Sequence, residues 1–343
     1  MKLLHSADWH LDSPLQGHCA QLFEALRSLP DRVVDLALAE ACDLMLLSGD
    51  IFDGTPSADT LSTLQRALRR AKIPVFIAPG NHDPAIFWPQ EGWSENVHIF
   101  RSAAVQSIAL PQLSCRVFGA AFTQNHSCAL LENFRAEGSE RYAIGIFHGD
   151  PTLHDSPYNP ISQHQVLESG LDYLALGHIH KGDSFQAGDT LCAWPGCAMG
   201  RGFDETGEKG VLIVQLDGAV SSRFVPLPLP RFYALSVPVQ GDAFSALCQW
   251  LPAIGSSDFY RVTLTGESEP VSLAQLASRF PQFPNLELRD QTLPPLPLWD
   301  SSGNDSLEGI YFALLQQADV PEALRHQAAT ISRQILAGRE VVL

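Results

Sequence analysis

Seven side chains of the kinds that bind divalent metal ions stand at the ends of five short apolar segments. Each motif alone is uninformative, because a strand-end Gly-Asp is usually a turn and a single histidine is more often structural than a ligand. Together they supply carboxylate, amide and imidazole groups without a thiolate, which suits Mn²⁺, Fe²⁺ or Zn²⁺. The pattern predicts a metal centre built from Asp8, His10, Asp50, Asn81, His148, His178 and His180.

The spacing of these residues suggests how they converge. In an extended chain, residues i and i+2 project to the same side, so Asp8 with His10, and His178 with His180, can each point into one cavity. A carboxylate on a turn, such as that of Asp50, can present both oxygens to two cations roughly 3.5–4 Å apart. Glycines beside four of the motifs allow sharp turns and close backbone approach. The arrangement is typical of a two-metal site.

The segments that carry these side chains alternate with helical segments over the first two-thirds of the chain. Leucines at helical spacing predict a helix over Ser57–Lys72 with Ser57 as its N-cap, and a second helix is expected over Phe23–Ala41. This alternation predicts an α/β fold, covered by helices on both faces, with its chemistry on loops beyond the strand ends. The apolar runs predict strands at Lys2–Ala7, Leu44–Ser48, Val75–Ala78, Val117–Ala121, Ala143–Phe147 and Tyr173–Leu176.

The pattern changes after Gly210, where a hairpin is expected around Asp217-Gly218. Two proline-rich links, 226–230 and 293–297, then bound a compact segment with strands and helices of its own. We expect a main domain over residues 1–228, an α+β capping domain over 229–298 and a helical C-terminal tail over 299–343. The expected elements are strands at Val211–Leu216, Val220–Val225, Phe232–Val239, Phe259–Thr265 and Leu286–Asp290, and helices at Ala243–Leu251, Ser272–Phe280, Leu307–Ala318 and Pro321–Ala337.

Composition limits the partners and the compartment. Twenty-two basic residues against 38 acidic ones give a net charge of −16, the wrong sign for binding nucleic acid through the general surface field. Two bound cations would reverse the sign locally, so a metal-dependent nuclease is not excluded. The chain has no apolar run of ~18 residues and no signal-like start, which predicts a cytoplasmic protein. Its scattered cysteines have no CxxC pair and are expected to be buried free thiols: Cys19, Cys42, Cys115, Cys128, Cys192, Cys197 and Cys248.

The five motifs, DxH, GDxxD, GNHD, HG and GHxH, resemble the signature of calcineurin-like metallophosphoesterases. The flanking runs at His5–Pro14, Asp172–His180, Trp194–Gly196 and Glu205–Gly210 are most similar to the SbcD and YhaO branch of DNA repair exonucleases, which is related to the Mre-eleven nuclease. The resemblance is dense from residue 1 to about 225 and rests on architecture alone over 232–290. It implies a two-sheet sandwich flanked by helices, followed by the small α+β capping domain and the short helical tail.

The resemblance also implies a role for each site residue. His82 would lie over the scissile phosphate and stabilise the transition state or protonate the leaving oxygen. Asp83 would orient His82 by accepting its other ring proton. Asp53, at a position where some relatives have histidine, would contact groups of the site without binding a metal itself. One metal would take Asp8, His10, Asp50 and His180, and the other Asp50, Asn81, His148 and His178.

The implied activity is hydrolysis of DNA phosphodiester bonds by an exonuclease or endonuclease. It implies two divalent ions, with Mn²⁺ favoured over Fe²⁺, Zn²⁺ or Mg²⁺, an SMC/Rad-fifty-like coiled-coil ATPase as partner, and homodimer formation. Two other functions stay open: a phosphatase or small-molecule phosphodiesterase on the same metal core, which the acidic charge favours slightly, and a non-catalytic scaffold. Lys181, Arg201 and Lys209 follow the last motif and are candidates for phosphate contacts.

Overall fold

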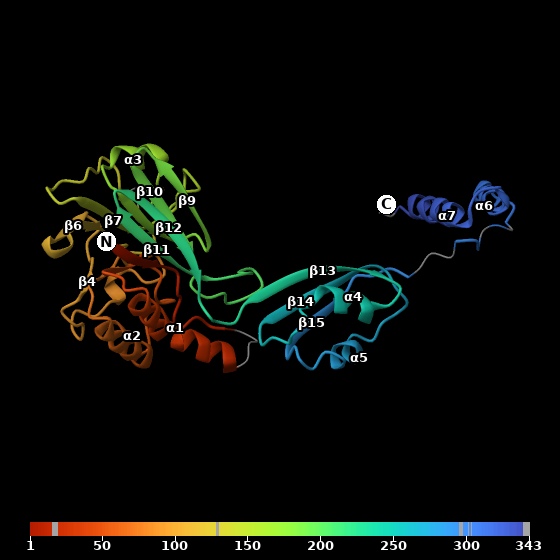
Figure 1. Ribbon diagram of the computed structural model, residues 1–343, viewed down its shortest axis with the longest axis horizontal. Helices are drawn as coiled ribbons and strands as arrows, with labels where there is room; N and C mark the ends of the chain where they lie inside the picture. The colour runs from red at the N-terminus through yellow and green to blue at the C-terminus, as the bar shows by residue number, and fades with distance from the viewer. Residues whose placement is uncertain (16–19, 128–129, 295–297, 301, 303, 339–343) are drawn as a thin grey trace. The chain divides into compact units, whose positions relative to one another are not determined.

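The computed structural model describes residues 1–15, 20–127, 130–294, 298–300, 302 and 304–338. The chain forms two compact units, Met1–Tyr233 and Ala234–Leu343, drawn in Figure 1. Cys19, Cys128 and residues 295–297 of the second proline-rich link lie outside the described residues. Among the described helices, none has the length and apolar character needed to cross a membrane.

The first unit is built on two mixed sheets of six strands each, which confirms the predicted α/β sandwich. The first sheet has the order β12-β11-β1-β2-β3-β4, and the second β5-β6-β7-β8-β10-β9. The strands of the first sheet are β1 (Lys2–Ser6), β2 (Leu44–Leu47), β3 (Val75–Ile77), β4 (Val97–Ile99), β11 (Gly210–Asp217) and β12 (Ala219–Pro226). Those of the second sheet are β5 (Gln106–Leu110), β6 (Cys115–Gly119), β7 (Tyr142–His148), β8 (Tyr173–Gly177), β9 (Lys181–Ala187) and β10 (Thr190–Gly196).

The central strands of each sheet are parallel, with antiparallel strands at one edge of the first sheet and at both edges of the second. Strands β1 to β4 pair in parallel, and the β11–β12 hairpin joins β1 in the antiparallel sense. In the second sheet β6, β7, β8 and β10 are parallel, with β5 and β9 antiparallel at the edges. Parallel strands present their carboxyl ends at one edge of a sheet, where ligands bind in α/β folds. The predicted metal motifs follow β1, β2, β3, β7 and β8, and therefore lie at these edges.

The two sheets share one hydrophobic core. Leu46 and Phe76 from the first sheet and Ile146 and Ala175 from the second are fully buried in the same cluster. Figure 1 shows α1 (Ala20–Ala39) and α2 (Ala58–Ala71) on one side of the two sheets and α3 (Gln163–Glu168) on the other. Ser57 caps α2 as predicted, because its side chain accepts a hydrogen bond from the backbone N–H of Thr60.

Four strands were not predicted: β4, β5, β9 and β10. The clearest case is β9, in which every residue but Phe185 and Ala187 is exposed. An edge strand that is polar and solvated shows no apolar run, so periodicity alone does not reveal it. The predicted burial of the cysteines also needs one correction. Cys42, Cys115, Cys192 and Cys197 are buried free thiols, but Cys248 is exposed.

The second unit contains the predicted α+β segment and the two predicted tail helices. Its three strands have the order β13-β14-β15, and β14 and β15 are parallel. The strands are β13 (Phe232–Gln240), β14 (Phe259–Glu267) and β15 (Asn285–Asp290), and the helices are α4 (Ala243–Trp250), α5 (Leu273–Ser278), α6 (Leu307–Gln317) and α7 (Glu322–Leu336).

The end of β8 lies unusually close to the loop after β2. A Cβ atom on Gly177 would meet the carbonyl oxygen of Ser48 at 2.1 Å and the Cβ of Ala7 at 3.0 Å. The two sheets therefore approach each other at this edge only because residue 177 has no side chain.

We predict that Gly177→Ala lowers the free energy of unfolding by about 1–3 kcal/mol, because the added methyl group has no room. The displaced strand end should also reduce the amount of metal that co-purifies with the protein. Gly218→Ala is the control for metal content, since its positive φ (80°) also costs stability but its Cβ would meet nothing within 4 Å. Chemical denaturation and elemental analysis measure both effects. Wild-type metal content in Gly177→Ala would contradict the prediction.

Candidate metal centre

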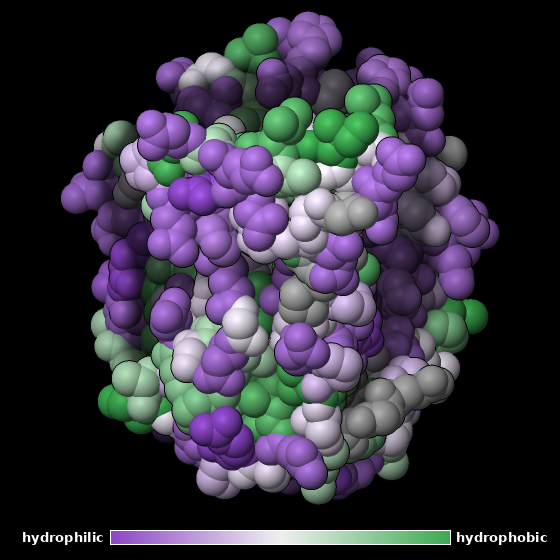
Figure 2. All heavy atoms as spheres, turned by 90° about the vertical axis from the view of Figure 1, so that its right-hand side faces the viewer, coloured by the Kyte–Doolittle hydropathy of each residue, from purple (hydrophilic) through white to green (hydrophobic). Residues whose placement is uncertain are grey.

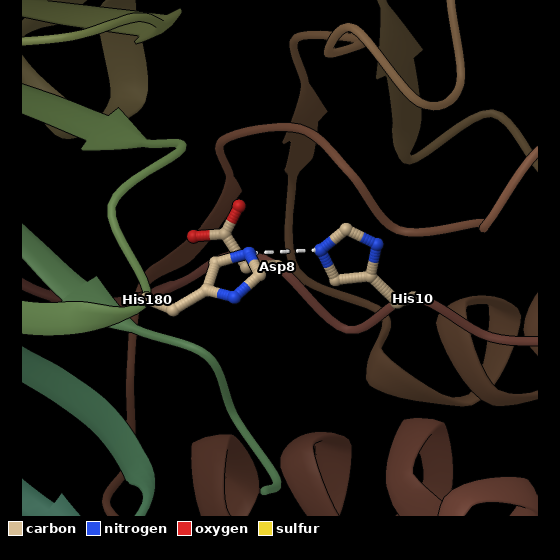
Figure 3. Close-up of side chains that lie close together, drawn as sticks. All are labelled: Asp8, His10 and His180. Atoms are coloured by element: carbon tan, nitrogen blue, oxygen red, sulfur yellow. Dashed lines mark hydrogen bonds between the residues drawn. The ribbon is translucent and has the colours of Figure 1, made fainter. Parts of the chain in front are cut away.

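Three of the predicted ligands converge from the two sheets. Asp8 and His10 follow β1 and His180 follows β8, and Figure 3 shows their side chains turned toward one another. The Nε2 atoms of His10 and His180 lie 3.1 Å apart, and ligand atoms of all three residues lie within 4.8 Å of one another. Two imidazole nitrogens at this distance must share either a proton or a cation, so the group is suited to hold a metal ion.

The other predicted ligands form a second group beside the first. The Oδ1 atom of Asn81 lies 2.9 Å from His148 Nε2 and 3.2 Å from His178 Nδ1. The Oδ2 atom of Asp50 lies 3.4 Å from His148 Nε2 and 3.9 Å from His10 Nε2. Asp50 thus stands between the two groups, as a bridging carboxylate would. The structure brings all seven residues together; their roles as metal ligands stay predictions.

Burial and neighbouring charges shift the pKa values of the site residues in different directions. Burial raises the pKa of Asp8, whose side chain is fully buried. Burial alone would lower the pKa of His148, but the charges of Asp50 and Asp8 outweigh it and raise that pKa to about 9. Burial and the charge of His148 lower the pKa of His178 to about 4. Carboxylate and imidazole groups held this close, without a thiolate among the seven, fit divalent cations.

The backbone of the site is not extended, which corrects the expected i, i+2 geometry. Asp8 (φ 52°), His10 (φ 47°), Asp50 (φ 50°) and His178 (φ 98°) all have positive φ. The backbone N–H groups of Asp8 and His10 donate to the carbonyls of Gly49 and Asp50, at 3.1 and 2.9 Å, so the loops after β1 and β2 are joined. Non-glycine residues with positive φ cluster at functional sites, where the surrounding structure holds the strain.

Asp83 does not have the role that was predicted for it. Its fully buried carboxylate accepts hydrogen bonds from the backbone N–H groups of Asp50, Ile51, Phe52 and Gly80, at 2.7 to 3.1 Å. Burial, together with the negative charge of Asp50, raises the pKa of Asp83 to about 7. Asp83 therefore holds the loop that carries Asp50 and does not accept the ring proton of His82.

The partner of the His82 ring is Asp53, whose Oδ1 lies 2.7 Å from His82 Nδ1. This hydrogen bond raises the pKa of His82. The His82 side chain is 47% exposed, whereas that of His10, against whose ring it packs, is 1% exposed. His82 is therefore the most exposed histidine of this cluster and open to a substrate, and Asp53 is placed to orient it.

Glu205 is a site residue that motif reasoning missed. Its buried carboxylate lies 2.7 Å from Nδ1 of His180, and it accepts hydrogen bonds from the backbone and side chain of Arg201. A proton on Nδ1 that bonds Glu205 leaves the Nε2 lone pair to face Asp8 and His10. No metal motif includes Glu205, which lies 25 residues after His180; its only sequence signal was the run Glu205–Gly210. Arg201, a candidate for phosphate contact, is instead bonded to Glu205.

A family model and a curated relative both match this chain. The family model for calcineurin-like phosphoesterases matches residues 1–182. The uncharacterized metallophosphoesterase YhaO of Bacillus subtilis (strain 168) is 34% identical over an alignment of 245 residues, which covers 65% of this chain and 60% of YhaO. The chain thus spans less than two thirds of the length of this curated relative.

Solved structures are similar over a comparable share of the chain. A dimetal phosphatase from Danio rerio matches with 12% identity and a TM-score of 0.45, covering 65% of this chain and 96% of the phosphatase. The protein TT1561 of Thermus thermophilus matches with 13% identity and a TM-score of 0.42, covering 65% of this chain and 98% of that protein.

Asp50→Asn and His178→Ala are predicted to lower metal content, because each removes a donor from the cluster. His82→Ala should keep the wild-type metal content, because its ring is held by Asp53 and faces solvent. Elemental analysis of the three purified variants checks both statements. Loss of metal in His82→Ala would show that His82 is itself a ligand.

Glu205→Ala is predicted to weaken metal binding about 10- to 100-fold, because His180 loses the group that sets its tautomer. Glu205→Gln should recover part of this loss, since an amide oxygen still accepts the Nδ1 proton. Calorimetric titration with Mn²⁺ measures the affinity, and Glu208→Gln, at an exposed carboxylate of the same run, is the control. Equal affinities for Glu205→Ala and wild type would exclude this positioning role.

Proposed function

The chain belongs to the calcineurin-like phosphoesterase family, and on that basis we propose that it is a two-metal phosphodiesterase that hydrolyses DNA. The observation that carries the proposal is the contrast between the donor cluster, five of whose seven residues are buried, and the exposed His82 beside it. A ring nitrogen of His82 lies within 4.8 Å of ligand atoms of His10 and Asp50. A phosphoester held at the cluster would therefore be within reach of a histidine that is free to move a proton.

The donor set divides into two metal sites that share Asp50. Bound divalent cations would supply an activated water near neutral pH and draw charge from the non-bridging phosphate oxygens. The first site would be formed by Asp8, His10, Asp50 and His180, and the second by Asp50, Asn81, His148 and His178.

The side chains around the cluster position and protonate the reacting groups. Asp53 raises the pKa of His82 and holds its Nδ1, so the ring keeps a proton that Nε2 can donate to the leaving sugar oxygen. The backbone N–H of His82 donates to Oδ1 of Asp50 at 2.9 Å, which ties the acid to the shared ligand. Asp83 keeps the Asp50 loop in place. No covalent enzyme intermediate is required.

DNA is proposed as the substrate on the strength of the flanking runs that resemble the SbcD and YhaO branch. The description of YhaO itself assigns no substrate. A phosphatase or small-molecule phosphodiesterase is the second candidate, and the net charge of −16 favours it because a polyanionic substrate is repelled by an acidic surface.

A coiled-coil ATPase partner of the SMC type is proposed from the resemblance and from the surface of the tail helices. Ile310 and Leu314 of α6 and Leu324 of α7 are 51%, 65% and 56% exposed. Figure 2 shows green hydrophobic residues in clusters on the face of the molecule that it views. Apolar side chains of this kind on a helix pair suit the groove of another helical protein. Homodimer formation is a further proposal that rests on the resemblance alone.

The purified protein with Mn²⁺ is predicted to cleave linear single- or double-stranded DNA. His82→Ala should lower the rate about 10²- to 10⁴-fold, which is the usual contribution of a general acid. The assay runs labelled DNA beside a chromogenic phosphomonoester. Turnover of the monoester without DNA cleavage would contradict the nuclease proposal and support the second candidate. Metal-loaded protein that acts on neither substrate would contradict both.

A further inference from the structure

A groove opens beside His180 in the first unit. Residues of β9 and β12, an edge strand of each sheet, contribute to its walls. Its walls come from the start of β9, from β10, from the 206–209 segment before β11, and from β12. Its volume is about 510 Å³, which is within the size range of ligand clefts. His180 itself lines the groove, so the groove borders the candidate metal centre.

Two lysines give the groove positive charge that no carboxylate of the described residues pairs with. The sequence has only four lysines, Lys2, Lys72, Lys181 and Lys209, and the last two both line the groove. Neither forms an ion pair with a carboxylate in the described part of the chain. Nζ of Lys209 donates to the carbonyl oxygen of His180 at 3.4 Å, and Lys181 is the residue after this predicted ligand.

The arginines of the same unit are, by contrast, largely neutralised. Each of the following forms an ion pair with a carboxylate: Arg27, Arg66, Arg70, Arg116, Arg135, Arg201, Arg223 and Arg231. Lys181 and Lys209 are therefore cations that stay available for an anion close to the predicted metals.

The groove also contains two acids, which do not cancel this charge. Glu208 is paired with Arg231 at 3.0 Å. Oδ1 of Asp183 accepts the backbone N–H of Ser184 at 2.8 Å. With the Glu208 charge balanced by Arg231, Lys181 and Lys209 outnumber Asp183 in the groove.

Aromatic side chains complete the groove. Phe224 on β12 is 41% exposed, so its ring can stack with a base. Trp194 is buried and donates its Nε1–H to the carbonyl oxygen of Lys181 at 3.0 Å, which fixes the backbone beside His180. Cations that track a phosphate backbone, together with an exposed ring, are the features that bind single strands without sequence preference.

We propose that this groove binds the sugar-phosphate backbone of a single-stranded nucleic acid that leads away from the metal centre. Lys181 and Lys209 contact phosphates, and Phe224 stacks on a base. The inference rests on the proposed phosphodiesterase function, because the strand is the substrate of that site. It explains how an acidic chain holds a polyanion: the contact is local and lies next to the metals.

Binding of a fluorescein-labelled oligothymidylate, followed by anisotropy in Mn²⁺ at several salt concentrations, tests the groove. All variants carry His82→Ala to prevent cleavage, and their metal content is checked. The double variant Lys181→Ala/Lys209→Ala should bind at least about tenfold more weakly, and the slope of log affinity against log salt should fall by about 0.7 for each lost phosphate contact. Phe224→Ala should weaken binding without changing that slope.

Two further variants keep the test specific. Lys181→Ala alone should change the slope by about half as much as the double variant does. The Lys181 side chain has no hydrogen bond or ion pair among the described residues, so its removal is not expected to disturb the fold. Lys72→Ala removes the same charge at the exposed end of α2, outside the groove, and should bind like the parent. Affinities and slopes of the groove variants equal to those of Lys72→Ala would overturn the inference, as would no binding by the parent.

The catalytic assay separates failure of the groove from failure of the proposed function. With His82 intact, Lys181→Ala/Lys209→Ala should lower kcat/KM for the oligonucleotide at least tenfold more than for bis(p-nitrophenyl) phosphate. Equal losses on the two substrates would overturn the groove assignment. Binding of the oligonucleotide without its cleavage by the wild type would support the groove and contradict the nuclease function.

Discussion

The carboxylate of Asp83 is the contact on which the candidate metal centre depends. It lies in the interior and accepts hydrogen bonds from the backbone N–H groups of Asp50, Ile51, Phe52 and Gly80. These bonds join the loop after β2 to the loop after β3, and so place Asp50 between the two groups of predicted ligands. A loop of polar backbone is otherwise costly to bury, because each unpaired N–H loses its bond to water. One short carboxylate satisfies four of these donors at once.

The site also holds its side chains in conformations that an isolated loop would avoid. Asp8, His10, Asp50 and His178 have positive φ, and such residues cost of the order of 1–3 kcal/mol each. The carboxylates of Asp8 and Asp50 add mutual repulsion in a buried position. The shared core of the two sheets offsets these costs, and the missing side chain of Gly177 lets the sheets approach closely enough to do so. Bound cations would remove the repulsion, since each would be the largest charge in the site.

The charge distribution suits a protein that recognises a polyanion locally. The net charge of −16 opposes nucleic acid at a distance, whereas Lys181 and Lys209 lie beside the predicted metals without a carboxylate partner in the described residues. Glu205, which is buried in the same region, pairs with Arg201 and orients His180. Catalysis and binding are thus proposed at one edge of the first unit.

The types of the predicted ligands, their order and the strands that carry them could be read from the sequence. Each motif stands directly after an apolar run, and a buried parallel strand is recognisable because it is apolar along its length. Exposed edge strands such as β9 lack that signal and were missed. The partners of the site histidines could not be read in this way. Asp83 is adjacent to His82 in the chain, yet Asp53, 29 residues away, holds its ring, and Glu205 holds His180. Such pairings depend on side-chain directions in loops with positive φ, and the packing of one sheet against the other sets those directions.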